Sequence, residues 1–268
     1  MAAERNKWLL ALALLQFSPT GIVRGELAHD RRLLFHFDKI EVRGEVDVFL
    51  RQGKRLRECS VYADKEIMDS VTTKVSERTL LVDANNTYDL NRRLPFLRIN
   101  AKRVFPVEVI VSVRDLSEIS LTGSGNLYGS GTKSMRLKLF SGGSGKLDLR
   151  NFSANAVEVI QDGSGDVVLM GNSVGKIDAV LSGTGSLYAG DLPAGSAKIS
   201  LRGRGNAHLS PIDFLDAGML SSGNVFLHDK PRQSAIRTNG TGVVRDVIPG
   251  SEPLYDLNAT KPKLQVER

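Results

Sequence analysis

Cysteine, histidine and aromatic residues are scarce in this chain, and each scarcity excludes a class of function. The single cysteine cannot form an intramolecular disulfide, and it has no second thiol at a metal-ligand spacing. The four histidines, His29, His36, His208 and His228, contain no His-x-x-x-His pair. Rings make up only 6% of the 268 residues, so a core must be mainly aliphatic. We therefore expect no metal, no cofactor and no catalytic residues.

The cysteine itself fits a buried strand better than a reactive site. Cys59, Val61 and Ala63 fall on one face of an alternating stretch. No histidine lies nearby in the sequence to act as a base, so we interpret Cys59 as a core residue rather than a nucleophile.

Charge is balanced along the chain and defines no nucleic-acid site. The net charge of +6 arises from 36 basic and 30 acidic residues spread over the whole sequence. Basic pairs such as Arg31-Arg32 and Arg92-Arg93 are isolated, and no aromatic residues are interleaved with them. We expect no nucleic-acid partner.

The N-terminus has the pattern of an export signal. Arg5 and Lys7 precede an apolar run at 8–17, which the helix-breaking segment 18–21 follows. About ten apolar residues are too few to span a bilayer, which needs about twenty, so residues 1–25 are interpreted as a signal peptide. An uncut N-terminal anchor is the alternative. No second membrane segment follows, so we expect a mature chain without an integral span, in the periplasm, on the outer membrane surface or outside the cell.

The strongest pattern is a Gly-x-Gly repeat with a constant spacing of 20 residues. Its copies are Gly123-Ser124-Gly125, Gly143-Ser144-Gly145, Gly163-Ser164-Gly165, Gly183-Thr184-Gly185 and Gly203-Arg204-Gly205, with looser copies at Ser221-Ser222-Gly223 and Gly240-Thr241-Gly242. Self-similarity at a fixed period of this length is typical of solenoids.

Alternating strand patterns flank each glycine corner in a constant phase. In one copy Leu137 and Leu139 precede the corner, and Leu147 and Leu149 follow it. The pattern predicts two strands per coil whose inward residues stack on those of the next coil. Glycine suits a corner that bends sharply, can need a positive φ, and lies about 4.8 Å from its neighbour. Residues 115–248 are therefore predicted to form an all-β parallel solenoid, or β-helix, with coils of about 20 residues. Hydroxyls at the aligned middle positions, such as Ser124 and Ser144, are expected to form a hydrogen-bonded ladder.

Two other interpretations of the glycines fail on their context. A dinucleotide or phosphate loop needs a helix after the glycines, whereas strands follow here. A calcium-binding nonapeptide repeat needs an aspartate two places after the last glycine, and Leu147 stands there. We expect no calcium site.

The flanking parts of the chain differ from the repeat. Residues 33–114 read as strands and turns without the glycine signature, with a short helix expected around Lys65 to Val71, and they are a candidate cap for one end of the stack. Residues 249–268 are polar and contain proline, which predicts a loose tail.

Several of these stretches together resemble a known family. They are the opening segment 37–44 (FDKIEVRG), the segment 48–53 (VFLRQG), the join 116–125 (LSEISLTGSG) and the serial corners. They are similar to the bacterial GIN domain, also called the putative auto-transporter adhesin head domain, over about residues 36–245. The resemblance implies an all-β, largely parallel solenoid in the cell envelope or outside the cell. It supplies no catalytic residues. The departures at Gly203-Arg204-Gly205 and Ser221-Ser222-Gly223 weaken the expectation of regular later coils.

Outward positions should align into rows along the stack. The row directly after the second glycine, here the turn-exit row, is Asn126, Lys146, Asp166, Ser186, Asn206 and Asn224. The row two places further, here the ring row, is Tyr128, Asp148, Val168, Tyr188, His208 and Phe226. Tyr128, Tyr188, His208 and Phe226 are the candidate partner-binding residues, for a glycan or a cell-surface protein, because exposed rings offer contact area at low entropic cost. The alternative is a structural ladder of rings, or packing under the C-terminal tail.

Two further classes of function remain open. Parallel β-helices can carry polysaccharide lyases and hydrolases, and the available acids are Asp148, Asp162, Asp166 and Asp178, although no partner stands at a motif spacing. An envelope structural protein without a specific ligand is the other. The sequence favours a non-enzymatic binding module.

Overall fold

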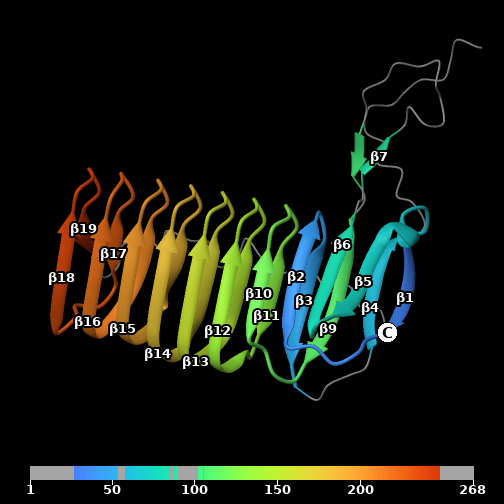
Figure 1. The fold of residues 1–268 in the computed structure, drawn as a ribbon, viewed down its shortest axis with the longest axis horizontal. Coiled ribbons are helices and arrows are strands. Elements are labelled where there is room, and N and C mark those ends of the chain that lie inside the picture. The colour runs from blue at the N-terminus through green and yellow to red at the C-terminus, as the bar shows by residue number, and fades with distance from the viewer. Residues whose placement is uncertain (1–26, 54–57, 85–86, 90–101, 105, 248–268) are drawn as a thin grey trace, which may run out of the picture.

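The computed structural model of the chain is a straight stack of parallel β-coils (Figure 1). It describes residues 27–53, 58–84, 87–89, 102–104 and 106–247. Consecutive coils pair in parallel with partners 20 residues apart, as between Leu147 and Val167. The predicted all-β parallel solenoid with coils of about 20 residues is confirmed.

The described residues form nineteen strands and one 3-10 turn. The elements are β1 (Leu27–Leu33), β2 (Lys39–Gly44), β3 (Asp47–Gln52), β4 (Glu58–Asp64), η1 (Met68–Ser70), β5 (Val71–Ser76), β6 (Thr79–Ala84), β7 (Thr87–Asp89), β8 (Lys102–Val104), β9 (Glu108–Val113), β10 (Glu118–Leu121), β11 (Leu127–Ser130), β12 (Lys133–Ser141), β13 (Leu147–Gln161), β14 (Val167–Leu181), β15 (Leu187–Leu201), β16 (Ala207–Met219), β17 (Val225–Leu227), β18 (Gln233–Thr238) and β19 (Val244–Asp246). The short helix expected around Lys65 to Val71 is the turn η1.

Each coil has two main sides that meet at a glycine corner. The pre-glycine sheet runs in the order β6, β2, β10, β12, the second halves of β13 to β16, and β18. The post-glycine sheet runs in the order β9, β3, β11, the first halves of β13 to β16, β17 and β19.

The segment between the two sheets forms a third side, which the sequence did not predict. β13, β14 and β15 each run 15 residues without a break, instead of the two separate strands expected per coil. Phe152, Val174 and Leu192 on this side are buried, and Ser153 pairs with Ser173. Apolar residues therefore hold the third side against the core as they do in the sheets.

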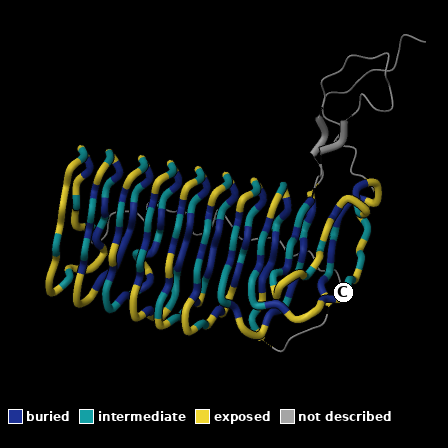
Figure 2. The backbone as a smooth tube through the Cα atoms, viewed as in Figure 1, coloured by how far each residue is buried: buried dark blue, intermediate teal, exposed yellow. Residues whose placement is uncertain are grey.

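Buried positions recur in every coil along the stack (Figure 2), and most of their residues are aliphatic and belong to one core cluster. Ile119, Leu139 and Val159 are aligned neighbours in successive coils, and all three are buried. Cys59 is buried in the same cluster, as expected of a core residue, and its burial raises the pKa of the thiol. A raised pKa disfavours the thiolate, which is the reactive form.

The corner glycines are required by contact between coils. A Cβ on Gly163 would lie 1.9 Å from the carbonyl oxygen of Gly143, and one on Gly203 would lie 1.9 Å from that of Gly183. Among the stacked corner glycines only Gly44 has a positive φ, of 74°, so a left-handed conformation is not the general reason that the sequence suggested. Close approach of backbones is the reason.

The loose copies of the repeat continue the stack. A Cβ on Gly223 would lie 2.2 Å from the carbonyl oxygen of Gly205, and one on Gly242 would lie 2.0 Å from that of Gly223. β16 has 13 residues instead of 15, which accounts for the shorter spacing between Gly205 and Gly223. The later coils are therefore regular at their corners.

The expected ladder of corner hydroxyls is absent from the described residues. Ser124, Ser144 and Ser164 lie exposed at the apex of each corner. Their backbone amides make the contacts instead, as Ser164 N donates to Gly143 O at 3.0 Å. Outward-pointing hydroxyls at an apex meet solvent, so the middle position tolerates threonine and arginine.

The N-terminal half forms coils of the stack, and it also forms the antiparallel strands at one end of the stack. β2 and β3 lie between the β6–β9 coil and the β10–β11 coil, and Gly44 underlies Gly123 at the corner. β1 and β5 pair antiparallel with β4 and β6 at that end, and β4 pairs antiparallel with β9. β7 and β8 form a separate small hairpin. The predicted signal peptide (1–25) and tail (249–268) lie outside the described residues.

A corner glycine should be intolerant of the smallest side chain. We predict that Gly163→Ala lowers the free energy of unfolding by about 3 kcal/mol, because its Cβ would meet a backbone oxygen that cannot turn aside. Urea unfolding followed by circular dichroism measures this. Gly218→Ala is the control, since its nearest atom would be 3.8 Å away, and an equal loss in both variants would contradict the contact.

Candidate functional site

The ring row lies on the outer side of the post-glycine sheet, in the order that the sequence predicts. Tyr128 pairs with Asp148, Asp148 with Val168, and Val168 with Tyr188. The row continues from Tyr188 to His208 and from His208 to Phe226. The predicted alignment is confirmed, although the rings divide into two groups.

Three of the candidate rings form one continuous stack. The ring centroids of Tyr188 and His208 are 5.0 Å apart at an interplanar angle of 14°, and those of His208 and Phe226 are 4.7 Å apart at 12°. Rings stacked in this way cover one another's faces, so their edges point away from the sheet. Tyr188 and Phe226 are partly exposed. The stack therefore presents a narrow ridge of ring edges.

The fourth candidate, Tyr128, belongs to a different pair. Its ring stacks on Phe49 of β3, with centroids 5.3 Å apart. Asp148 and Val168, both buried, separate this pair from the three-ring stack. Phe49 could not be assigned to this row from the sequence, because the β2–β3 coil lacks the Gly-Ser-Gly signature that places the later rows.

His208 is a buried member of the stack rather than an exposed contact, which corrects the sequence expectation. Only 4% of its surface is exposed. Its Nδ1 lies 3.4 Å from Nε2 of His228, whose ring leans over Gly190, where a Cβ would be 2.5 Å from Nε2. Burial, with the neighbouring His228, lowers the pKa of His208 to about 4. The imidazole is therefore neutral at pH 7.

A buried ion cluster occupies the middle of the ring row. Asp148 is 2% exposed, and its carboxylate accepts from Lys146 Nζ at 3.0 Å and from Arg150 Nε at 3.1 Å. Burial raises the pKa of the adjacent Tyr128, and the charges of Asp47 and Asp148 add to this. Since Lys146 and Arg150 lie two residues before and two residues after Asp148 in the chain, the cluster neutralises this acid locally.

The turn-exit row is a structural ladder. Oδ1 of Asn126 accepts from the backbone N of Lys146 at 3.0 Å, and Oδ1 of Asn206 accepts from the backbone N of Asn224 at 3.0 Å. Oδ1 of Asp166 accepts from Ser186 N at 2.8 Å in the same way. Side-chain oxygens at this position thus tie one coil to the next, which explains their polarity without a ligand.

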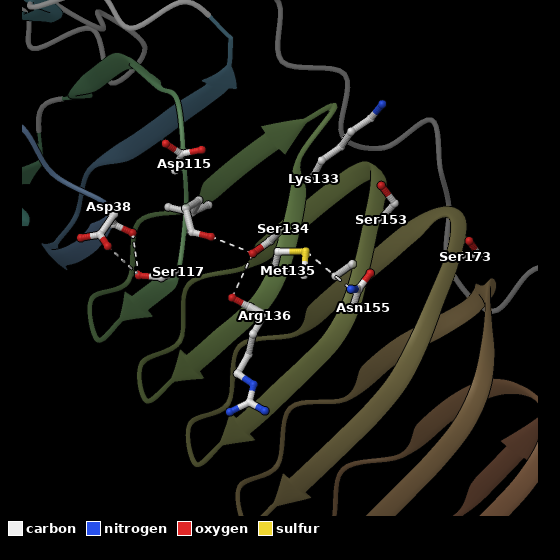
Figure 3. A pocket seen from close by; sticks show the side chains of 12 residues that line it. Asp38, Asp115, Ser117, Lys133, Ser134, Met135, Arg136, Ser153, Asn155 and Ser173 are labelled. Atoms are coloured by element: carbon white, nitrogen blue, oxygen red, sulfur yellow. Dashed lines mark hydrogen bonds between the residues drawn. The ribbon is translucent and has the colours of Figure 1, made fainter.

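A second surface feature is a groove of about 690 Å³ on the third side of the stack (Figure 3). Its walls at one end are the segment 115–117 and β12, and its lining continues across β12 to Ser153 of β13 and Ser173 of β14. The ring row lies on another side of the coils. In the described residues no group of three or more His, Cys, Asp or Glu could hold a metal ion.

A family model described as "Putative auto-transporter adhesin, head GIN domain" matches residues 36–231. The chain belongs to the GIN domain family. The resemblance inferred from the opening segment, the join and the corners is thereby confirmed. None of the described helical segments of this GIN domain has the length and apolar character needed to span a membrane.

Solved structures share the fold of this GIN domain at low sequence identity. A putative adhesin from Bacteroides fragilis superposes with a TM-score of 0.71 at 19% identity, covering 83% of this chain and 97% of that one. A putative adhesin from Parabacteroides distasonis gives 0.59 at 18%, covering 83% and 98%. A protein described as a putative lipid binding protein, also from Parabacteroides distasonis, gives 0.59 at 20%, covering 84% and 98%. No curated protein matches the chain.

The buried imidazole should make stability depend on pH. The folded-state pKa of His208, about 4, lies below the ordinary value of 6.5, so the unfolded chain binds the proton first as the pH falls. We predict that this group lowers the free energy of unfolding by about 3 kcal/mol between about pH 6.5 and about pH 4. Urea unfolding at a series of pH values measures it.

Replacing the imidazole isolates its contribution from that of the carboxylates. His208→Phe keeps a stacked ring and should remove the part of the pH dependence of the unfolding free energy that His208 causes. His36→Asn, at an exposed histidine, should keep it. Equal slopes in the wild type and His208→Phe would contradict a neutral buried His208.

Proposed function

We propose that this GIN domain is an exported, non-enzymatic, adhesin-like binding protein of the cell envelope, whose ridge of ring edges contacts a protein on another surface. The observation that carries the proposal is the stack in which Tyr188 and Phe226 enclose the buried His208. The strand register fixes the rings in place, so little side-chain entropy is lost when a partner binds. The family name and the adhesin descriptions of structural relatives support the same role.

The geometry favours a protein over a glycan at this ridge. A sugar that stacks on an aromatic residue needs an open ring face, and both faces of His208 are covered by Tyr188 and Phe226. Ring edges beside a tyrosine hydroxyl suit the mixed apolar and polar surface of a protein partner, where aromatic residues are enriched. Of the two partners that the sequence allowed, we therefore propose the protein.

An enzyme is the less favoured alternative, because the four candidate acids already have structural partners. Asp148 pairs with Lys146 and Arg150, Asp162 accepts from Ser182, Asp166 accepts from the Ser186 amide, and Asp178 pairs with Lys176. A general acid or base must reach the substrate with its carboxyl group. Turnover of an acidic polysaccharide that Asp166→Asn abolishes would support the enzyme instead.

Export rests on the N-terminal sequence pattern. Arg5, Lys7 and the apolar run 8–17 have the order of a signal peptide. Sequencing the N-terminus of the protein recovered from the envelope or medium tests this, with cleavage before Glu26 as the expected result. A chain retained in the cytoplasm would contradict the proposal.

Loss of the ring edges should weaken attachment to cells. We predict that the double variant Tyr188→Ala, Phe226→Ala binds protein-bearing cell surfaces at least about tenfold more weakly, because aromatic anchors at the centre of an interface each contribute about 2 kcal/mol. Binding of the purified chain to intact cells, quantified by flow cytometry, measures this. His208 is left unchanged because it is buried and its loss would disturb the stack.

The control variant removes an aromatic ring from the pre-glycine sheet, away from the ring row. Phe140 of β12 points outward from the pre-glycine sheet and is partly exposed, so Phe140→Ala should bind as the wild type does. Treating the cells with protease should abolish binding. Full binding by the double variant, with its fold retained, would contradict the proposed surface. Binding that survives protease treatment of the cells would contradict a protein partner. The absence of any binding would favour a purely structural envelope protein.

A further inference from the structure

The groove on the third side exists because the order of coils in space differs from their order in the sequence. The chain leaves β9 and must pass the β2–β3 coil to reach β10, so the segment 114–117 crosses the third side at this point. The regular third side begins only with β12, which pairs with β13 through Lys133 and Ser153. The groove of about 690 Å³ begins at the crossing segment and extends across β12 to β13 and β14, and its volume is typical of ligand sites (Figure 3).

Hydrogen bonds hold the two walls of the groove at a fixed separation. The side chain of Gln52 donates to the carbonyl oxygens of Arg114 at 2.9 Å and Lys133 at 2.8 Å, and it accepts from the Lys133 amide. Ser134 Oγ donates to the Leu116 carbonyl oxygen at 2.8 Å. The side-chain amide of Gln52 thus makes the hydrogen bonds that the backbone of an intervening strand would make. The groove is therefore formed before any ligand binds.

The acids of the groove are neutralised, whereas its bases are not. Asp38 pairs with Arg78 at 2.8 Å, and Asp115 pairs with Arg114 at 2.9 Å. Lys133 and Arg136 are exposed, and no carboxylate of the described residues lies within salt-bridge distance of either. The uncompensated charge at the groove is therefore positive.

Neutral polar groups line the groove beside the two cations. Ser153 pairs with Lys133 across β12 and β13, and Ser173 is the aligned residue of the next coil. Between the cations on β12 lies Met135, 76% exposed, whose Sδ accepts from Asn155 Nδ2 at 3.5 Å. Lys133 and Arg136 extend in opposite directions from the β12 wall (Figure 3). Three residues of strand separate their backbones by about 10 Å, so one ligand that meets both cations must be elongated.

We propose that this groove binds an acidic oligosaccharide, with carboxylate groups at Lys133 and Arg136 and sugar hydroxyls at Ser153, Ser173 and Asn155. A guanidinium binds a carboxylate through paired hydrogen bonds, and an ammonium adds a second charge contact. Hydroxyl and amide side chains donate to and accept from the sugar ring. This site is on a different side of the coils from the ring row and does not depend on the protein partner proposed there.

Calorimetric titration with tetragalacturonic acid tests the groove directly. Saturable binding to the full chain is expected, weakening as salt is added because the cations are exposed to solvent. Lys133→Ala together with Arg136→Ala should lower the affinity at least about tenfold. Asn155→Trp, at an exposed position, should block the groove without changing its charge.

Matched controls separate this site from other surfaces. Arg202→Ala removes an exposed cation elsewhere and should leave the affinity unchanged, and Tyr188→Ala should do the same. Maltotetraose, a neutral sugar of equal length, and monomeric galacturonic acid should bind far more weakly. Any of three results would overturn the proposal. The wild type could fail to bind tetragalacturonic acid, or maltotetraose could bind equally well. The third is full affinity in the correctly folded double variant Lys133→Ala, Arg136→Ala or in correctly folded Asn155→Trp.

Discussion

The contact of one corner glycine with the backbone of the glycine one coil earlier sets the geometry of this molecule. A Cβ at Gly143, Gly163 or Gly183 would lie within about 2 Å of a carbonyl oxygen, so only glycine permits the coils to approach at the strand spacing. At that spacing the sheets gain parallel hydrogen bonds on every side of the coil, and aliphatic residues stack inside it. Each coil thereby fixes the register of the next.

Both proposed binding surfaces are consequences of that register. Because equivalent positions superpose from coil to coil, an outward residue acquires a neighbour of the same row, and Tyr188, His208 and Phe226 become a stack rather than three isolated rings. The groove arises where the register is interrupted by the inserted β2–β3 coil. A regular stack offers flat faces, and the irregular join at the β2–β3 coil offers a recess for a small ligand.

The strict period made much of the structure predictable from sequence. A spacing of 20 residues assigns the corners, the inward ladder and the outward rows without knowledge of contacts, and the family follows from the same residues together with the opening segment. The burial of His208 was not predictable, because it depends on His228 leaning over Gly190. Phe49 was missed because β3 lacks the Gly-Ser-Gly signature, and the groove was missed because no period shows that the β2–β3 coil lies between the β6–β9 and β10–β11 coils.

Distances between corner apices test the stacked register most directly. Spin labels at the exposed positions Ser124, Ser164, Thr184 and Arg204, attached in pairs with Cys59 replaced by alanine, report separations along the stack. The account predicts that the distance from 124 rises linearly by about 4.8 Å per coil, giving about 10, 14 and 19 Å for the three pairs. Separations that do not increase in equal steps would contradict a parallel stack with its corners on a common line.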